Sequence, residues 1–396
     1  MDPSPNFHIA IIGSGPIGKL LACSALPHPG ITISQHEADV PPLRPSFGYG
    51  VGPQTLHTIH VLNPSLGNKL QQKCFTSQTW MHWWHGGPPD CHISDVQVPD
   101  GKLFGRVGRE ELLELLDESA PGTSGASRDI QYGKKLVSVR KIGEHEVELT
   151  FHDGTKGYAN AVWAADGVNS LCRKKLEVGQ VVALVGEYFA QRTCMFIGVK
   201  GWHVLIFPIE DGKSINIAAF CVEPELQKLG RDSKVSLEEI LGHFPGRNAK
   251  VDTLLRLVQS DTPGGCQRLH ISHMEQLGSL FNEELSMTLF GDAANTTTPH
   301  IAASMSCGVI GCCTFLHEEW NPLIRSGKLA ADASHAQIAA AMAEASRRYE
   351  KKHLPLAQKL VDISAEQGPL WSGGVTDVAT LKARPLFLWC CADDKR

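Results

Sequence analysis

Three glycines near the start of the chain are spaced to form a phosphate-binding turn. Gly13, Gly15 and Gly18 follow a short β-branched apolar run over 7–12 and open a helical pattern that extends over 19–26. In a turn of this type the first glycine permits a tight bend, the second lets the backbone approach a pyrophosphate, and the third lets the helix pack on the strand. The N–H groups at the helix N-terminus then attract the phosphates.

An acidic residue follows at the distance expected for ribose recognition. A second apolar strand is predicted over 31–34, and Glu37 lies nineteen residues after Gly18. A carboxylate in this position binds a ribose hydroxyl in dinucleotide-binding folds. The strand, turn, helix and strand form one βαβ unit and predict a dinucleotide site. The alternative is that the same turn is kept for structural reasons and binds no ligand.

Two later motifs identify the kind of dinucleotide. The segment "AADGVNSLCRKKL" places Asp166, Gly167 and Arg173 after an apolar strand, and "LFGDAAN" places Gly291 and Asp292 after another. With the glycine turn, these motifs occur in the order seen in group A flavoprotein monooxygenases. The chain resembles this family, specifically its salicylate-hydroxylase or aromatic-hydroxylase type, from about residue 7 to about residue 365.

The resemblance implies an FAD cofactor, reduction by NADPH or NADH, and transfer of one oxygen atom to a small molecule. In this family the early glycines and the acid hold the ADP half, two arginines face the cofactor, and an aspartate binds the ribityl chain. The positions that the resemblance assigns to the cofactor are Gly13, Gly15, Gly18, Glu37, Arg44, Arg109, Asp166, Gly167, Arg173, Gly291, Asp292, Ala302 and Ser304.

The segment from Asn295 to Ser304, here called the altered segment, departs from the family pattern. Glycines are usual where this chain has Ala302 and Ser304, and a histidine is usual where it has Asn295. An added methyl group is tolerated if the backbone φ is negative and is strained if φ is positive. Asn295 forms hydrogen bonds but cannot exchange a proton near neutral pH. The ADP side of the predicted site is therefore intact, whereas the flavin side is altered.

Candidate substrate and catalytic residues come from aromatic and histidine-rich segments. In "TWMHWWHGG", strand alternation places His82 and Trp84 on one face and Trp83 and His85 on the other. They are predicted to form an aromatic wall for a flat apolar ligand, with ordinary core packing as the alternative. The resemblance adds Phe207 and Pro208 as substrate contacts. The catalytic candidates are His203, His300 and Asn295.

Composition limits the other functions that the chain can have. Of its 396 residues 42% are hydrophobic and 20% are charged, and the net charge is −5. The sequence has no long basic run that would favour binding to nucleic acid. It also has no apolar run long enough to cross a bilayer. The N-terminus lacks a signal-peptide pattern, so a cytoplasmic location is expected. The twelve cysteines include no C-x-x-C pair, which favours reduced thiols and no metal site.

The predicted fold class is α/β: an FAD-binding Rossmann-like domain, interleaved with a mixed β-sheet substrate domain and followed by C-terminal helices. Residues 1–75, 105–180 and 270–325 are expected to form the FAD domain. Residues 76–104 and 181–269 are expected to form the substrate sheet, and 326–396 the helical region, with Pro355 as a break or kink. A homodimer stays open as an alternative to a monomer.

The favoured function is an FAD-dependent, NAD(P)H-using monooxygenase that acts on an apolar aromatic or polycyclic small molecule, by family analogy in secondary metabolism. The altered glycine positions keep a second hypothesis open. This is a non-redox cyclase or isomerase on the same fold, in which FAD is structural or absent and the pocket holds a reactive conformer. A ligand-binding protein without turnover is a third alternative, which no motif specifically favours.

Overall fold

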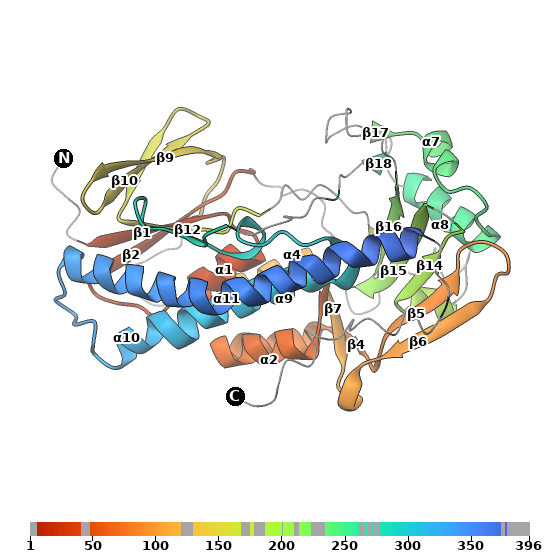
Figure 1. The fold of residues 1–396 in the computed structure, drawn as a ribbon, viewed down its shortest axis with the longest axis horizontal. Coiled ribbons are helices and arrows are strands. Elements are labelled where there is room, and N and C mark those ends of the chain that lie inside the picture. Colours follow the sequence, from red (N-terminus) through yellow and green to blue (C-terminus); the bar gives the residue numbers. More distant parts are fainter. Residues whose placement is uncertain are drawn as a thin grey trace.

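The computed structural model describes most of the chain in an ordered arrangement of helices and strands (Figure 1). The described residues are 6–40, 48–119, 130–167, 175–177, 187–199, 201–209, 214–222, 234–260, 266–267, 271, 278–373 and 377. Two predicted cofactor residues, Arg44 and Arg173, lie outside these ranges. The α/β fold class that the motifs predict is confirmed.

A six-stranded sheet forms the centre of the nucleotide-binding half. Its strand order is β19-β20-β12-β1-β2-β8, and all neighbours are parallel except β19 and β20. The strands are β1 (Phe7–Ile12), β2 (Ile31–His36), β8 (Ile130–Gln131), β12 (Ala161–Ala164), β19 (Phe281–Asn282) and β20 (Met287–Leu289). The strands predicted over 7–12 and 31–34 are the adjacent β1 and β2.

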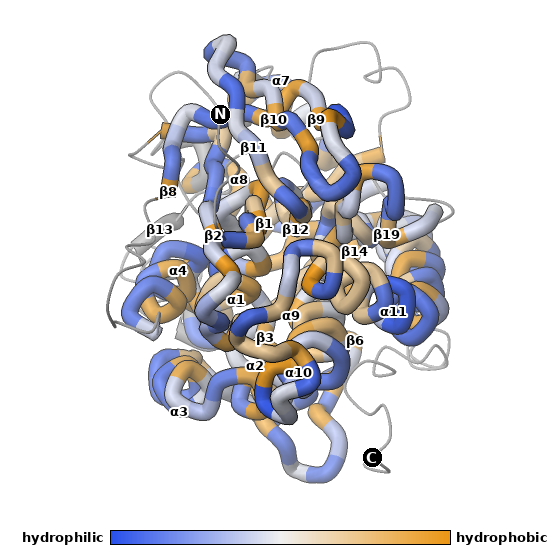
Figure 2. Tube along the Cα trace, turned by 90° about the vertical axis from the view of Figure 1, so that its left-hand side faces the viewer, coloured by the Kyte–Doolittle hydropathy of each residue, from blue (hydrophilic) through white to orange (hydrophobic). Residues whose placement is uncertain are grey.

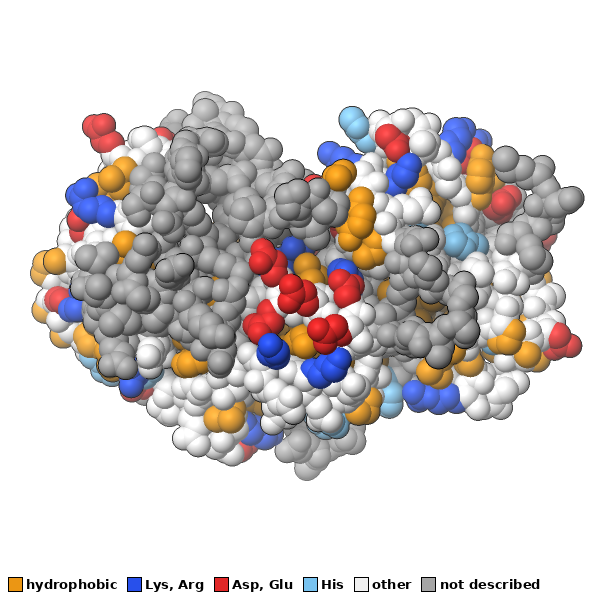
Figure 3. All heavy atoms as spheres, turned by 180° about the vertical axis from the view of Figure 1, so that it is seen from behind, with side chains coloured by type: hydrophobic (Ala, Val, Ile, Leu, Met, Phe, Trp, Pro, Cys, Tyr) orange, Lys and Arg blue, Asp and Glu red, His pale blue; other side chains and the backbone are white. Residues whose placement is uncertain are grey.

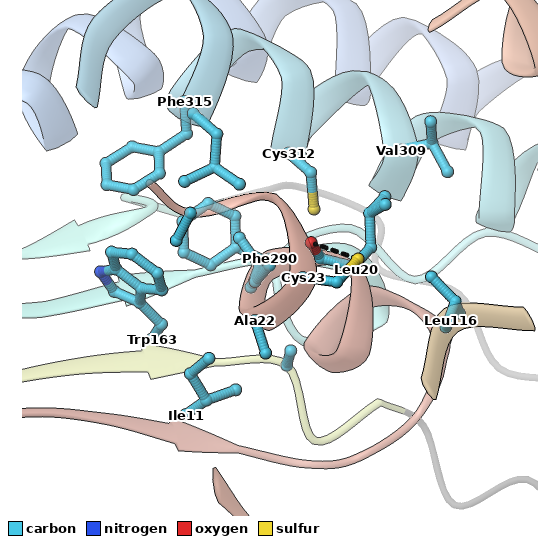
Figure 4. Close-up of a cluster of buried hydrophobic side chains, with 14 of the residues drawn as sticks. Ile11, Leu20, Ala22, Cys23, Leu116, Trp163, Phe290, Val309, Cys312 and Phe315 are labelled. Carbon is cyan, nitrogen blue, oxygen red and sulfur yellow. Dashed lines mark hydrogen bonds between the residues drawn. The ribbon is translucent and has the colours of Figure 1, made fainter. Parts of the chain in front are cut away.

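Helices cover this sheet because their apolar sides are buried against it. The helices are α1 (Pro16–Ser24), α4 (Arg109–Glu118) and α9 (Ala303–Cys313). Figure 4 shows the shared core, where Trp163 of the sheet meets Phe290 and Phe315 at ring-centre distances of 6.4 and 5.4 Å. Burial of such large aromatic groups is a main source of folding free energy. In Figure 2, α4 carries both hydrophilic and hydrophobic residues, as expected of a helix with one buried side.

A second six-stranded sheet forms the other half, with the order β13-β16-β15-β14-β5-β6. Its strands are β5 (Thr79–His85), β6 (His92–Gln97), β13 (Lys175–Glu177), β14 (Cys194–Ile197), β15 (Trp202–Ile209) and β16 (Ser214–Cys221). The sequence division had assigned 175–177 to the FAD domain, but β13 pairs with β16 of this second sheet. One face of the sheet packs on α7 (Leu237–Gly242) and α8 (Ala249–Ser260).

Smaller sheets and helices complete the structure. The antiparallel strands β3 (Gly48–Val51), β7 (Phe104–Gly108) and β4 (Phe75–Ser77) lie between the two large sheets (Figure 1). The glycine-containing strand β3 leads directly into α2 (Pro53–Leu62). The remaining larger elements are α3 (Pro64–Lys73), β9 (Leu136–Gly143), β10 (Glu146–Phe151), β11 (Lys156–Ala159), α6 (Glu187–Ala190) and α10 (Asn321–Arg325).

The longest helix, α11 (His335–Ser372), runs along both halves of the molecule (Figure 1). Ser334 begins it with a capping box in which Gln337 returns the hydrogen bond. The break expected at Pro355 is not found, because the helix continues through this residue. Proline removes one backbone hydrogen bond, and tertiary packing on both sides retains the helix here. Among the described residues, no helix combines the length and apolarity needed to cross a membrane.

The cysteines of the described chain are all free thiols, but they differ in exposure. Cys23 and Cys194 are buried, Cys313 is half-buried, and Cys221, at the end of β16, is exposed.

On the face shown in Figure 3, Lys and Arg side chains of the described residues occur in small groups beside acidic ones.

Buried histidines make the fold sensitive to acid. His353 of α11 stacks on Tyr349 at 5.3 Å, and burial lowers its pKa to about 4. Below about pH 6.5 the unfolded chain binds a proton on this residue, whereas the folded chain stays neutral until about pH 4. Acidification through this window therefore favours unfolding.

We predict that His353→Phe reduces the loss of stability between about pH 7 and about pH 5 by about 2 kcal/mol, since a pKa difference of one unit corresponds to about 1.4 kcal/mol. Urea unfolding at both pH values measures the change. His57→Gln is the control, because His57 is exposed. An unchanged pH dependence in the His353 variant would show that this group does not govern the acid response.

Candidate functional site

The predicted cofactor residues meet at one edge of the central sheet. The strands β20, β12, β1 and β2 are parallel, so their carboxyl ends lie at the same edge. Gly13 follows β1, Glu37 follows β2, Asp166 lies just past β12, and Asp292 lies just past β20. In open α/β sheets, this edge is where nucleotide ligands bind. Residues far apart in the sequence are thereby collected into one row.

The glycine turn has the geometry that a pyrophosphate site requires. Gly13 has a φ of +101°, and a side chain there would overlap the backbone of Ala165. A side chain at Gly18 would overlap the carbonyl oxygen of Gly13, whereas the space in front of Gly15 is open. Helix α1 then begins at Pro16 with no side-chain cap on its N-terminus. Its first N–H groups and its dipole are thus available to an anion.

Glu37 is held against this turn. Its carboxylate accepts hydrogen bonds from the Ser14 backbone N–H at 2.7 Å and the Ser14 hydroxyl at 2.8 Å. Its second oxygen accepts the Asp39 N–H at 3.0 Å. Burial raises the pKa of nearby Asp166, and the negative charge of Glu37 raises it further. The two acids therefore mark a polar end of the site, suited to neutral hydroxyl groups rather than to phosphates.

The altered segment has a strained backbone. Ala302 has φ +52° and ψ +31°, which is the left-handed region that favours glycine. Its methyl group faces Gly50 of β3, where an added Cβ would lie 3.2 Å away. Ser304 donates a hydrogen bond to the Asp292 carboxylate. Residue 302 therefore keeps a backbone conformation typical of glycine although it is an alanine.

Asn295 is placed in a buried position close to the same aspartate segment. It is fully buried, its backbone N–H donates to Gly291 at 2.9 Å, and its side-chain amide nitrogen and oxygen have no partner among the described residues. A buried amide without partners is costly, on the order of 1–3 kcal/mol for each group. These atoms are therefore suited to a polar ligand, although the side chain is no acid or base.

The two candidate histidines are brought together. The rings of His203 and His300 lie 5.3 Å apart, and His203 stacks on Phe220 at 4.5 Å with an angle of 15°. The Trp371 ring lies edge-on to both histidine rings, and its ring centre is 5.6 Å from the centre of each. Burial, and then the proximity of His300, lower the pKa of His203 well below its ordinary value. His203 is therefore a neutral imidazole at physiological pH.

Hydrogen bonds fix the orientation of both rings. His203 Nδ1 lies 3.1 Å from the Ser372 hydroxyl, and His300 Nδ1 lies 2.8 Å from the Thr298 hydroxyl. His203 Nε2 is buried and has no partner among the described residues. Because the ring is neutral, this nitrogen either donates or accepts a hydrogen bond, depending on the tautomer. His203 can thus bind a substrate hydroxyl or carbonyl oxygen.

The aromatic candidates divide between the two faces of the second sheet, as alternation predicts. Trp83 packs with Ile301 and Ala303, which places it on the side of the altered segment. Trp84 packs in the separate cluster that includes α8, and His82 points to the same side, toward Tyr188. The four residues therefore do not form one continuous wall. His85 shares the side of Trp83 by alternation.

The later strand residues divide in the same way. Phe207 lies near Gly48 of β3, where an added Cβ would approach its ring to 2.5 Å. It is on the side of the altered segment. Pro208 pairs with Ile215, which belongs to the cluster covered by α8, so it faces away. Among the predicted substrate residues Trp83, His85 and Phe207 are placed to face the altered segment, whereas His82, Trp84 and Pro208 are not.

The remaining cofactor candidates occupy expected elements. Arg109 is the first residue of α4, and Gly167 follows Asp166 with φ +64°. Three residues of this region were not predicted from the sequence: Ser14, which contacts Glu37, and Phe220 and Trp371, which lie around the histidines. Ser14 lies inside the glycine motif and was therefore detectable. Trp371 was not, because its position depends on how a long helix crosses the second sheet.

Comparison with known proteins agrees with this geometry. Salicylate hydroxylase from Pseudomonas putida is 25% identical to the chain over 407 aligned residues, which cover 92% of this chain and 86% of that protein. The chain is a homologue of FAD-dependent monooxygenases. No family model matches it.

Solved structures share the fold of this chain. A salicylate hydroxylase substrate complex superposes with a TM-score of 0.70 at 20% identity, covering 97% of this chain and 95% of that chain. CtdE in complex with FAD and substrate gives a TM-score of 0.68 at 17% identity, and 97% of each chain is covered. Identities at this level show a common fold. The resemblance that the motifs predict is confirmed by homologues named salicylate hydroxylase and FAD-dependent monooxygenase.

The left-handed backbone at residue 302 leads to a prediction. Ala302→Gly should raise the free energy of unfolding by up to about 1 kcal/mol, because glycine has no Cβ to strain at positive φ. Ala303→Gly is the matched control. It lies one residue later in helix α9, is fully buried, and should destabilise the protein. Chemical denaturation measures both variants, and destabilisation by both would contradict the strain at residue 302.

Proposed function

We propose that this protein is an FAD-dependent, NAD(P)H-using monooxygenase that inserts one oxygen atom into an apolar aromatic or polycyclic small molecule. The row of Gly13, Glu37, Asp166 and Asp292 at one sheet edge is the observation that carries the proposal. The names of its homologues support an aromatic substrate. A role in secondary metabolism and a cytoplasmic location are parts of the same proposal.

The residues present fit FAD. Among the described residues, no atom fills the space in front of Gly15 and no side chain caps the N-terminus of α1, which suits the pyrophosphate, and Glu37 suits a ribose hydroxyl. Asp292 and the Asn295 amide, which has no partner in the described part of the chain, offer polar contacts for the ribityl and ring portions. When bound, FAD supplies the redox chemistry, since it accepts hydride from NAD(P)H and activates dioxygen. The protein holds the cofactor, orients the substrate and excludes water.

His203 and His300 are proposed to orient the substrate. Both lie on the side of the second sheet that meets residues 300–307, and His203 Nε2 has no partner among the described residues. A neutral imidazole can fix a phenolic or carbonyl oxygen without adding charge. The apolar residues Trp83 and Phe207 would contact the aromatic portion of the substrate.

The altered segment also supports a second candidate function. Ala302 adds a methyl group where the family has glycine, and Ser304 hydrogen-bonds to the aspartate expected to bind the ribityl chain. A non-redox cyclase or isomerase would need only a shaped, dry pocket that holds a near-attack conformer. Consumption of NADPH separates the two functions, because only the monooxygenase oxidises it in step with product formation.

The deciding experiment is the visible spectrum of the purified protein, recorded without oxygen before and after NADPH is added, with and without monohydroxybenzoates. Flavin bands that NADPH bleaches, followed by oxygen uptake with an aromatic compound, are the expected result. A colourless protein, or a bound flavin that stays oxidised with NADPH and every aromatic compound offered, would refute the monooxygenase proposal.

A pair of variants tests the role assigned to Asp292. Asp292→Ala should weaken FAD binding by about tenfold or more, because a charged hydrogen-bond acceptor is removed. Ser304→Ala removes the same serine–aspartate contact but keeps the carboxylate, so FAD affinity should change by less than about threefold. Fluorescence titration of FAD into the flavin-free protein measures both. Equal losses in the two variants would assign the effect to the contact rather than to the carboxylate.

A histidine variant tests the proposed substrate contact. His203→Leu should lower kcat/KM for the best aromatic compound by about tenfold or more and leave FAD affinity unchanged. The control is His243→Leu, which lies just after α7 on the far side of the second sheet. Steady-state oxygen uptake measures the effect. Full activity in the His203 variant would exclude this residue from substrate orientation.

A further inference from the structure

A cluster of two histidines and one aspartate lies on the outer strands of the second sheet. His82 of β5 and Asp95 of β6 are direct partners across the antiparallel pair, and His92 lies three residues before Asp95. One ring nitrogen of each histidine and one oxygen of the carboxylate all lie within 4.8 Å of one another. The cysteine spacing fits no zinc pattern and predicts no metal site, whereas these three residues include no cysteine.

The two rings converge on a single carboxylate oxygen. Asp95 Oδ1 lies 2.7 Å from His82 Nδ1 and 2.6 Å from His92 Nε2. The hydroxyl of Tyr188, from α6, lies 3.2 Å from the same His82 nitrogen. Four polar groups from three separate elements are thus linked by close contacts to His82 Nδ1 and Asp95 Oδ1. Hydrogen bonds between them hold the arrangement when no ion is bound.

The surroundings hold the donor atoms in place. His82 is buried, and its strand is paired on both sides, with β14 and β6. The ring of Trp84 packs edge-on against His92 at 5.2 Å and against Tyr188 at 5.5 Å. A metal site needs ligands that are oriented by packing, because each fixed side chain loses less entropy on binding. His92 and Asp95 are partly exposed, so an ion can enter from solvent.

The donor set selects a class of ion. Two imidazoles and one carboxylate suit Zn²⁺ and its neighbours in the transition series, whereas Mg²⁺ and Ca²⁺ prefer oxygen donors. With bonds of about 2.0–2.1 Å in a tetrahedron, the donors should stand about 3.3 Å apart. The present separations would have to grow by several tenths of an ångström, which the partly exposed His92 and Asp95 allow. Water or the Tyr188 hydroxyl would take the fourth position.

The cluster is separate from the proposed flavin site. His82 and Trp84 face α6 and α8, whereas Trp83 faces residues 301–307 from the opposite side of the sheet. We propose that His82, His92 and Asp95 form a binding site for a divalent transition-metal ion of the zinc class. The ion would tie the β5–β6 pair to Tyr188 and stabilise the outer edge of the second sheet.

The test uses the full-length, untagged protein after chelator treatment and dialysis. Cys91→Ser serves as the background for every variant, because Cys91 is exposed and adjacent to His92 and its thiol is also a metal ligand. Zn²⁺ binding is measured by calorimetry, and Co²⁺ is used as a visible-absorption probe of coordination. Saturable binding of one Zn²⁺ per chain, with a tetrahedral Co²⁺ spectrum and a rise in melting temperature with Zn²⁺, is the expected result. Mg²⁺ should produce none of these effects.

Three substitutions locate the site. His92→Ala and Asp95→Asn should each weaken Zn²⁺ binding by about tenfold or more and abolish the rise in melting temperature. His85→Ala is the matched control, since it removes a histidine three residues along the same strand that faces the other side. Because His92 and Asp95 are partly exposed, both variants should fold, and their melting temperatures without metal verify this.

The proposal is overturned if the background protein shows no saturable Zn²⁺ binding. It is also overturned if the His92 and Asp95 variants bind as tightly as the background, or if the His85 control loses binding to the same extent. Flavin content and NADPH oxidation are measured in parallel, so failure of the metal site and failure of the monooxygenase proposal are seen separately.

Discussion

Close backbone packing at the carboxyl ends of β1 and β12 is the constraint on which the rest of the nucleotide site depends. A Cβ at Gly13 would lie 2.3 Å from the Ala165 carbonyl oxygen and 2.9 Å from Asp166 Cα, so these two strand ends can approach only if residue 13 has no side chain. This close approach brings the glycine turn, the Glu37 carboxylate and the Asp166 segment to one edge. The same constraint recurs beside Ile17 of α1, where a Cβ at Gly291 or Gly308 would lie 3.0 or 2.7 Å from the Ile17 side chain.

The second sheet depends on a different principle, which is the separation of its two faces. The outer face is covered by α7 and α8 and is largely apolar, whereas the inner face carries His203 and Phe207 toward the altered segment. Alternation of side chains along β5 and β15 assigns each residue to one face. Neighbours in sequence, such as Trp83 and Trp84, therefore contribute to different parts of the molecule.

The glycine turn, the first strands and the family resemblance could be predicted from sequence because their signals are local. Gly13, Gly18 and Glu37 each act within a short segment whose backbone is set by neighbouring residues. For Ala302 the sequence left both a negative and a positive φ open, because the residue type alanine does not determine the sign of the backbone φ angle. The His82–Asp95 pair and the position of Trp371 depend on strand register and helix direction, which no local pattern encodes. Of the break or kink expected at Pro355, the break does not occur, because tertiary packing outweighs the local preference of proline.

The length of α11 has a mechanical consequence. The helix is joined to the first half through Glu350, whose carboxylate accepts the N–H groups of Leu280 and Phe281, and its far end is joined to the second sheet through Ser372. A single helix thus links both halves, so the two halves cannot rotate apart unless the helix bends. A change in the relative orientation of the two halves would therefore also require loss of the contacts that Glu350 or Ser372 makes.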